Sequence, residues 1–380
     1  MSFITNPVYV LVVLCLMVIL SVYASQTKYG KPFGAALLVI LFTAIIANLK
    51  LIPSASNSIP LYDAIFKYVA PISIFYLLLN VSLRSIKQAG LPMVSLFLIG
   101  SLATALGVLL SWFILKPETV LGDDAKIIAG MFTGTYTGGS VNFNAVALEY
   151  DFQKNGILYA GTIAVDNVIT TIWMIITLLI PTVLSRIWKG RTVVTTTKDM
   201  DAMEHPEDEG MDLNAMMWLF FLGISAYYVS ELLSALFPQI PSILILSTIG
   251  ILLAQMRFVA SLKGSHQLGL FLVYIFLAVI GAYCEIGAVS QLEHLGIMLL
   301  MFAGLAVLLH GIILILISGF MYRDWEIVAI VSQANIGGGT SAIALAEAFK
   351  RKDLILPAIL VGSLGNALGT YLGFFVIYVL

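Results

Sequence analysis

The sequence predicts an all-α protein that crosses a lipid bilayer many times. Of its 380 residues, 60% are apolar and only 11% are Asp, Glu, Lys or Arg, whereas a soluble domain carries about 25% charged residues. The mean hydropathy is +1.01. Four long stretches contain no Asp, Glu, Lys or Arg, namely 88–115, 232–256, 295–322 and 354–380. This composition excludes a soluble enzyme, a nucleic-acid-binding protein and a disordered chain, and the formal net charge of −2 suggests no polyanionic partner.

Twelve segments are long and apolar enough for a spanning helix, which needs about 20 such residues. Continuous apolar runs also lack the alternation of a membrane β-barrel. We therefore expect about twelve transmembrane helices, within a range of 10–13. The segments centre on 7–24, 32–51, 61–83, 90–115, 125–150, 156–187, 213–237, 240–257, 267–289, 295–320, 325–349 and 353–380.

One hydrophilic stretch, 188–212, divides the chain into two halves, 1–187 and 213–380. It begins with basic residues, among them Lys189 and Arg191, and ends in an acidic run from Asp199 to Asp212. This pattern is typical of a solvated linker. Basic residues near helix ends favour a cytoplasmic side. We therefore expect a multi-pass protein of the cell membrane, such as a bacterial inner membrane, with the linker in the cytoplasm.

The two halves resemble each other. When the sequence is shifted by 199 positions, Thr133–Thr171 lies on Ser332–Thr370 without a gap. The identical pairs include Gly138 with Gly337, Gly139 with Gly338, Ala145 with Ala344, Ala147 with Ala346, Asn167 with Asn366, and Thr171 with Thr370. A double glycine and a membrane-embedded asparagine that recur together predict an internal repeat, which is common in secondary transporters.

The orientation of the two repeats stays open at the level of sequence. Six crossings in each half would make the halves parallel, whereas inverted repeats require an odd number of crossings in each half. Either one of the predicted segments does not cross the membrane once, or the repeats are parallel.

Two matched segments combine glycines with polar residues. Residues 131–150 read MFTGTYTGGSVNFNAVALEY, and residues 330–349 read IVSQANIGGGTSAIALAEAF. Each glycine costs a helix interior roughly 1 kcal/mol relative to alanine. We therefore expect broken helices near 133–144 and 332–341. Freed backbone at bilayer depth is tolerated only beside protein or a wet cavity, where half-helix ends face anions and carbonyl groups hold cations.

The hydroxyl, amide and glycine residues around the two breaks are the predicted substrate-binding residues. Small-residue packing between helices is the alternative interpretation, but two matched polar motifs favour a binding site. The set comprises Thr135, Thr137, Gly138, Gly139, Ser140, Asn142, Asn144, Gln333, Asn335, Gly337, Gly338, Gly339, Thr340 and Ser341.

Asp166 is an acid placed deep in an apolar segment, in the sequence GTIAVDNVITT. Such a residue costs about 2.5–3.5 kcal/mol on insertion and marks a functional site by default. It could carry a proton or ligate sodium, and the surrounding oxygen-rich residues favour sodium slightly. The predicted ion-coupling residues are Asp166, Asn167, Asn366 and Glu285. The alternative is an acid that pairs with a neighbouring helix for structural reasons.

The remaining embedded polar residues give weaker signals. Glu285 could line the cavity or could have a structural or interfacial role instead. Glu231 is predicted to be structural. A lone histidine on an apolar helix, His310, is expected to be a hydrogen-bonded packing residue. Cys15 and Cys284 lie in apolar runs without a metal-binding or CxxC pattern, and we expect both to pack.

Catalytic motifs are absent from the sequence. It contains no GxGD, HExxH, GxSxG or Walker A pattern. The sequence therefore predicts neither an enzyme nor a bound cofactor.

Several blocks resemble a known family. GTYTGGSVNFNAVA, DNVITT and QANIGGGTSAIALAEAFKRKDLILPAILVGSLGNALGTYLG are similar to the membrane-protein family catalogued as domain of unknown function 819. That family is distantly similar to the superfamily of cation/proton antiporters, glutamate–sodium symporters and bile acid–sodium symporters. The resemblance implies that 125–150 and 325–349 are crossed, broken helices in a mobile elevator core. It also implies that Asp166–Asn167 is similar in kind to the antiporters' acidic and amide residues. The family names no substrate.

Together these patterns predict a secondary active transporter. It would move a small polar or anionic organic solute by alternating access around a midplane site, coupled to sodium or protons. The expected partners are this solute, the ion, the lipid bilayer and a second copy in a homodimer, with no nucleic acid. An ion or solute channel is the first alternative, and a membrane-embedded enzyme with an unrecognised motif is the second.

Overall fold

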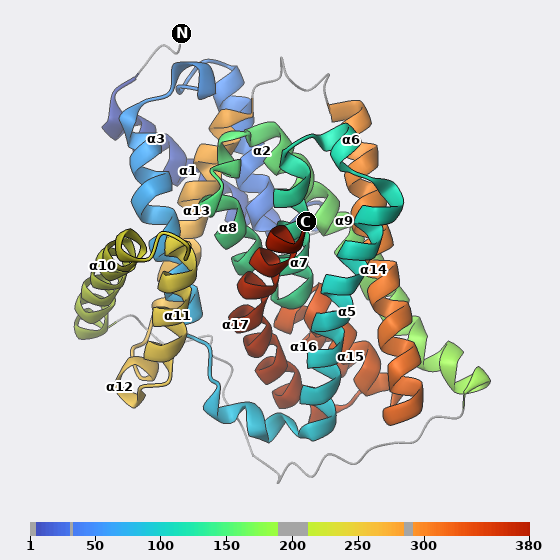
Figure 1. The fold of residues 1–380 in the computed structure, drawn as a ribbon. Coiled ribbons are helices and arrows are strands. Elements are labelled where there is room, and N and C mark those ends of the chain that lie inside the picture. Colours follow the sequence, from blue (N-terminus) through green and yellow to red (C-terminus); the bar gives the residue numbers. More distant parts are fainter. Residues whose placement is uncertain (1–4, 31–32, 189–211, 285–291) are drawn as a thin grey trace.

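The computed structural model describes residues 5–30, 33–188, 212–284 and 292–380 (Figure 1). The described residues form helices and contain no strand. The α-helices are α1 (Pro7–Ser25), α2 (Gly34–Asn48), α3 (Pro60–Ala64), α4 (Ala70–Leu78), α5 (Leu91–Leu115), α6 (Glu118–Leu121), α7 (Asp124–Gly138), α8 (Ser140–Glu149), α9 (Gly156–Ile187), α10 (Leu213–Leu236), α11 (Ser242–Ala254), α12 (Arg257–Ala260), α13 (Ser265–Tyr283), α14 (Leu292–Met321), α15 (Trp325–Ile336), α16 (Gly338–Ala348) and α17 (Ile355–Val379). Shorter segments are η1 (Ala55–Asn57), η2 (Ile65–Val69), η3 (Arg84–Ala89), η4 (Phe152–Lys154) and η7 (Lys352–Leu354).

Eight of the described helices are long and apolar enough to cross a bilayer. They are α1, the continuous run Pro60–Leu78, α5, α9, α10, α13, α14 and α17. Two further apolar helices, α2 and α11, are shorter. The chain is thus a multi-pass helical membrane protein. The prediction of about twelve spans exceeds this number by four, because 125–150 and 325–349 are not single helices and because α2 and α11 are short.

Each of these two segments folds back on itself as a helical hairpin. In the first hairpin, α7 packs against α8, and a Cβ placed on Gly134 would lie 3.2 Å from the backbone of Asn142. Residues eight positions apart are neighbours only if the chain reverses between them. In the second hairpin, α15 packs against α16, and Gly337 at the turn contacts both Gln333 and Ser341. The breaks predicted near 133–144 and 332–341 are present. The expectation of two crossed, broken helices is wrong, because the chain reverses direction at the glycines of both segments.

The two hairpins enter the molecule from opposite ends. Gly100 lies beside His310, and Gly107 lies beside Ala306. Since the residue numbers rise along α5 while they fall along α14, the two helices are antiparallel. The first hairpin follows the C-terminal end of α5, and the second follows the C-terminal end of α14. Since these two ends lie at opposite ends of the helix pair, the hairpins approach each other and meet at their tips. Figure 1 shows α7 and α8 above α15 and α16.

A stripe of glycines lets the hairpins pack closely against α17. Gly138, Gly134 and Gly130 of α7 face Gly365, Gly369 and Gly373 of α17, respectively, at successive turns of both helices. Gly339 of α16 faces Gly362 in the same way. Small residues at such a crossing allow two backbones to approach, which is the main source of helix association in a bilayer.

The helices form two groups. The flanking group contains α1, α2, α3, η2, α4, α10, α11 and α13, in which α13 packs on α2 and α4, and α10 packs on α11. The hairpin group contains α5, α7, α8, α9, α14, α15, α16 and α17, in which α17 packs on α7 and α14 packs on α5 and α9. In Figure 1, α1, α10 and α11 lie at the left, while α5, α14 and α15 lie at the right.

Two prolines lie within long apolar helices. The π segment η2 comes directly before Pro71. A proline removes one backbone donor and crowds the preceding turn, which a π segment relieves by widening that turn. Pro181 lies inside α9, and the helix continues past it to Ile187.

An ionic cluster closes the base of the second hairpin. Arg351, which follows α16, donates to Glu326 Oε2 at 2.8 Å and to both carboxylate oxygens of Asp353 at 2.8 and 2.9 Å. Its Nη1 also lies 3.5 Å from Asp324 Oδ2. Asp324, whose side chain is only 4% exposed, accepts a hydrogen bond from the Ile327 amide and so caps α15. The hydrogen bond to Asp353 raises the pKa of the Arg351 guanidinium, so this cation joins both ends of the hairpin at any physiological pH.

We expect Arg351→Ala to lower the free energy of unfolding by about 3 kcal/mol, because it removes the cation that joins Glu326, Asp353 and the nearly buried Asp324. The matched control is Lys154→Ala. Lys154 forms an exposed ion pair with Asp151 at the base of the first hairpin, with 52% and 65% of the side chains exposed, and such pairs contribute roughly 0–1 kcal/mol. Thermal unfolding of the purified protein in detergent measures both. Equal unfolding temperatures for the two variants would contradict a structural role for the cluster.

Candidate functional site

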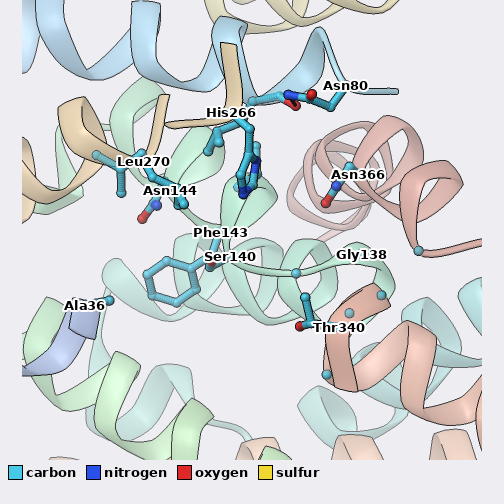
Figure 2. A pocket seen from close by; sticks show the side chains of 18 of the residues that line it. Ala36, Asn80, Gly138, Ser140, Phe143, Asn144, His266, Leu270, Thr340 and Asn366 are labelled. Carbon is cyan, nitrogen blue, oxygen red and sulfur yellow. Dashed lines mark hydrogen bonds between the residues drawn. The ribbon is translucent and has the colours of Figure 1, made fainter. Parts of the chain in front are cut away.

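A cavity of about 590 Å³ lies where the hairpin tips face the flanking group. Its hairpin-group walls come from both tips, α9 and α17, and its flanking-group walls come from α2, α4 and α13. Figure 2 shows Asn80 and His266 at the top of the view, Ser140 and Thr340 below them, Asn144 near His266, and Asn366 at the right. The cavity therefore lies between the two helix groups rather than inside either one.

The hairpin tips bring the N-terminal ends of two helices to the cavity. Gly139 precedes α8 with φ +101°, and Gly338 begins α16 with φ +77°, backbone conformations that favour glycine. A Cβ placed on Gly338 would lie 4.0 Å from the Gly139 Cα, so the two tips touch. Neither α8 nor α16 has a side-chain cap. Because the first N–H groups of a helix lack intrahelical partners and carry partial positive charge, the tips offer two converging sets of anion-binding donors.

Polar side chains surround the two tips in matched positions. Ser140 and Thr340 follow the glycines of the first and second tip, and both line the cavity. Asn366 of α17 approaches the first tip, with its Oδ1 3.9 Å from a Cβ placed on Gly139. Asn167 of α9, which the shift by 199 positions aligns with Asn366, also lines the cavity. The amides and hydroxyls extend the hydrogen-bonding capacity of the helix ends.

Asp166 is the acidic residue among the described cavity-lining residues, which include no Lys or Arg. The residue is half-buried, yet its Oδ1 is fully buried and has no hydrogen-bond partner. The nearest polar groups belong to Tyr136 and Thr135 of α7. The Tyr136 hydroxyl is also buried and interacts electrostatically with the carboxylate, but the pair has no hydrogen bond of good geometry. A buried carboxylate oxygen without a donor is costly unless a proton or a cation neutralises it.

The structure divides the predicted substrate-binding residues into two sets. Eight line the cavity, namely Gly138, Gly139, Ser140, Asn144, Gly337, Gly338, Gly339 and Thr340. Six lie behind the tips, namely Thr135, Thr137, Asn142, Gln333, Asn335 and Ser341. Of the predicted ion-coupling residues, Asp166, Asn167 and Asn366 line the cavity, and Glu285 lies outside the described residues.

The residues behind the tips hold the hairpins in place. Asn142 donates to Gly365 O at 3.3 Å and accepts from the Thr370 amide and hydroxyl at 3.0 and 2.8 Å. Asn335 donates to Ser101 Oγ at 3.0 Å and lies 3.4 Å from Thr137 O of the other hairpin. These amides satisfy backbone and side-chain groups in the interior, so their contacts are structural. The sequence interpretation did not separate them from cavity residues, because both kinds are polar and close to the glycines.

Three cavity residues of the flanking group were missed by the sequence interpretation. They are His266 and Tyr274 of α13 and Asn80, which follows α4. A fourth missed residue, Ser363, belongs to α17. Single polar residues in or beside apolar segments give no periodic signal, and only the tertiary contacts of α4, α13 and α17 bring these side chains to the cavity.

His310 belongs to a buried network away from the cavity. Its Nδ1 lies 3.0 Å from Gly100 O and from Thr104 Oγ1, and its Nε2 lies 3.0 Å from Ser332 Oγ. Trp173 Nε1 donates to the same Ser332 hydroxyl at 3.0 Å. A neutral ring that donates from Nδ1 to Gly100 O and accepts at Nε2 from Ser332 satisfies this arrangement. His310 is thus a hydrogen-bonded packing residue, as the sequence analysis expects, and it ties α5, α9, α14 and α15 together.

The helical fold and the membrane-spanning segments define a multi-pass membrane protein with a cavity among its helices that both polar and apolar residues line. The chain belongs to the family described as "Protein of unknown function (DUF819)", which it matches over residues 9–380. It is also similar to "Uncharacterized membrane protein YjcL" of Bacillus subtilis (strain 168), with 27% identity over 368 residues, or 92% of this chain and 90% of the relative. The resemblance to this family, which rested on the two glycine-rich blocks, is confirmed.

Gly138→Ala tests the close packing that positions the first tip. A Cβ at this position would overlap the backbone of Gly365, and backbone atoms in a packed crossing cannot move aside as a flexible side chain can. We expect a loss of about 3 kcal/mol in unfolding free energy, the upper end of the usual cost of overpacking. Thermal unfolding in detergent is the measurement.

Gly296→Ala is the matched control for this substitution. Gly296 lies within α14, and no atom lies within 4 Å of a Cβ placed on it, so alanine should leave stability unchanged or raise it by up to about 1 kcal/mol. If Gly138→Ala is tolerated as well as Gly296→Ala, the tip is not held by the contact with α17.

Proposed function

We propose that this protein is a secondary active transporter that moves a small polar or anionic organic solute, coupled to sodium or protons. The observation that carries the proposal is the cavity, which two hairpin tips and an embedded acid form at the boundary between two helix groups. Helix ends that meet within the hydrophobic region of a membrane protein are a recurrent way to bind solutes and coupling ions there.

Alternating access would follow from relative motion of the two groups. The hairpin group carries both tips, Asp166, Asn167 and Asn366, whereas the flanking group supplies the opposite, largely apolar wall that includes Leu77 and Leu270. If the hairpin group moves as one body against that wall, it carries the solute with it while the contacts at the tips persist. This arrangement supports an elevator-type mechanism.

The repeat proposed from sequence supports the same division. Shifted by 199 positions, α7, α8 and α9 begin at 323, 339 and 355, close to the observed starts of α15, α16 and α17. If the shorter apolar helices α2 and α11 also cross, each half has five crossings and one hairpin: α1, α2, Pro60–Leu78, α5 and α9 in the first half, and α10, α11, α13, α14 and α17 in the second. An odd number of crossings inverts the second half. We therefore propose inverted repeats within 1–187 and 213–380, joined by 188–212.

Asp166 is the proposed coupling residue, as a proton carrier or as a sodium ligand. Its buried, unpartnered Oδ1 supports this role, because a proton or a cation at that atom would remove the uncompensated charge. The charge is present in one half only, since the repeat counterpart is Gly365.

The contact between the tips favours a transporter over a channel. Gly139 and Gly338 meet at the centre of the molecule, whereas a channel needs a continuous open path. We retain the proposals that the protein is not an enzyme, needs no cofactor, forms a homodimer, and resides in the cell membrane with 188–212 in the cytoplasm.

Reconstituted protein should show saturable counterflow of a labelled solute from a panel of amino acids, monocarboxylates and nucleobases. Asp166→Asn should fold, because it keeps the shape of the side chain and removes a buried charge. It should abolish accumulation driven by a sodium or proton gradient, while exchange at equilibrium continues. Glu231→Gln makes the same chemical change at an exposed position of α10 and is the control. Accumulation by the Asp166 variant with unaltered ion dependence would remove Asp166 from the coupling mechanism, and single-channel currents would indicate a channel.

A further inference from the structure

The charges around the cavity restrict what can bind there. The described lining residues contribute one carboxylate, Asp166, and no Lys or Arg. Each tip joins the C-terminus of one helix to the N-terminus of the next, α7 to α8 and α15 to α16, so the helix dipoles add little net charge there, although the free N–H groups remain local hydrogen-bond donors. With Asp166 ionised, the side chains that line the described cavity therefore bring one uncompensated negative charge. An anionic solute adds a negative charge that no described lining residue offsets.

The tips provide the place for one carboxylate group. Their helix ends converge from opposite sides and touch at Gly139 and Gly338, and the hydroxyls of Ser140 and Thr340 and the amide of Asn366 lie around them. Each of the two oxygens of a carboxylate can accept a hydrogen bond from one helix end. A neutral group of similar shape forms weaker hydrogen bonds there. A second anionic group on the solute would find no further positive partner.

The missing positive charge has a natural place at Asp166. Its Oδ1 is buried beside the buried hydroxyl of Tyr136, and the two groups interact without reaching the geometry of a good hydrogen bond. An ammonium group on the solute would have to reach this covered atom, whereas a proton or a dehydrated monovalent cation is small enough to occupy it. The buried oxygen thus favours a separate cation over a zwitterionic solute.

We infer that the solute is a small organic monocarboxylate that binds against the two hairpin tips, and that it binds only when a proton or a monovalent cation neutralises Asp166. This inference rests on the proposed function and deepens it. The two ligands are then coupled electrostatically: the cation removes the repulsion between Asp166 and the solute carboxylate, and by linkage the carboxylate strengthens cation binding by the same factor.

The test is equilibrium binding to the purified protein in lipid nanodiscs, without transport. Propionate, lactate and pyruvate are the probes, and propionamide and lactamide are uncharged controls of matched shape. Alanine is included as the zwitterionic relative of propionate. Isothermal calorimetry and the shift in unfolding temperature are recorded in sodium chloride and in choline chloride, each across a series of pH values.

We expect an acid to bind and its amide not to bind. Removing sodium at high pH, where protons cannot replace it, should lower the affinity for the acid by roughly 5–150-fold, the usual range for coupled sites. Asp166→Asn should bind the same acid with an affinity that is independent of sodium and pH, since no charge remains to be neutralised. Glu231→Gln should keep the dependence of the parent protein.

Three outcomes would overturn the inference. The first is equal binding of acids and their amides. The second is binding of alanine, independent of sodium, in preference to every acid. The third is an Asp166→Asn protein that binds the acid with an unaltered cation dependence. The failure of this inference can be told apart from the failure of the proposed function. If neutral solutes bind and show counterflow in proteoliposomes, the protein is still a transporter and only the monocarboxylate inference is lost.

Discussion

The structure depends on how its non-helical backbone is shielded by neighbouring helices inside the membrane. Two chain reversals place irregular backbone among the spanning helices, where no water satisfies an exposed N–H or C=O group. Glycine crossings solve this problem: Gly138 lies against Gly365, and Gly339 lies against Gly362. With no side chain between the helices, α17 covers the backs of both hairpins and leaves only their tips open. The same contacts therefore provide packing energy and define which backbone donors remain free.

The free donors and the cavity have a common origin in these reversals. A continuous helix at 125–150 would use all its central N–H groups internally, whereas a helix that starts again at Ser140 leaves its first N–H groups without intrahelical partners. The second hairpin repeats this at Gly338 from the opposite end. The free N–H groups at both tips are local donors that an acid or a bound anion nearby can satisfy. Asp166 lies at the same cavity, which makes the electrostatics of the tips and of the acid inseparable.

The interior polar network determines which parts of the molecule form one unit. His310, Ser332, Trp173 and Thr104 join α5, α9, α14 and α15 by hydrogen bonds, and Asn335 joins the second hairpin to α5. In a bilayer, such bonds between helices have no competition from water. The flanking group meets the hairpin group around the cavity through mostly apolar side chains, including Leu77, Leu270 and Leu277. Apolar surfaces can slide past each other at low cost, whereas the hydrogen-bonded interior of the hairpin group resists deformation.

The sequence by itself determined that this protein lies in a membrane, that it is helical, and where its helix breaks and its embedded acid lie. Composition alone required a membrane, because 11% charged residues cannot cover a soluble particle of this size. The glycine pairs predicted the two helix breaks, and the isolated charge at Asp166 indicated a functional acid, since both features are costly in a bilayer wherever the helix lies. Local sequence could not decide whether the chain continues or reverses after a break. That choice depends on whether a distant helix, α17, offers glycines for the backbone to pack against. Only the tertiary structure therefore turned two expected crossings into hairpins, separated Asn142 and Asn335 from the cavity residues, and brought Asn80 and His266 to the site.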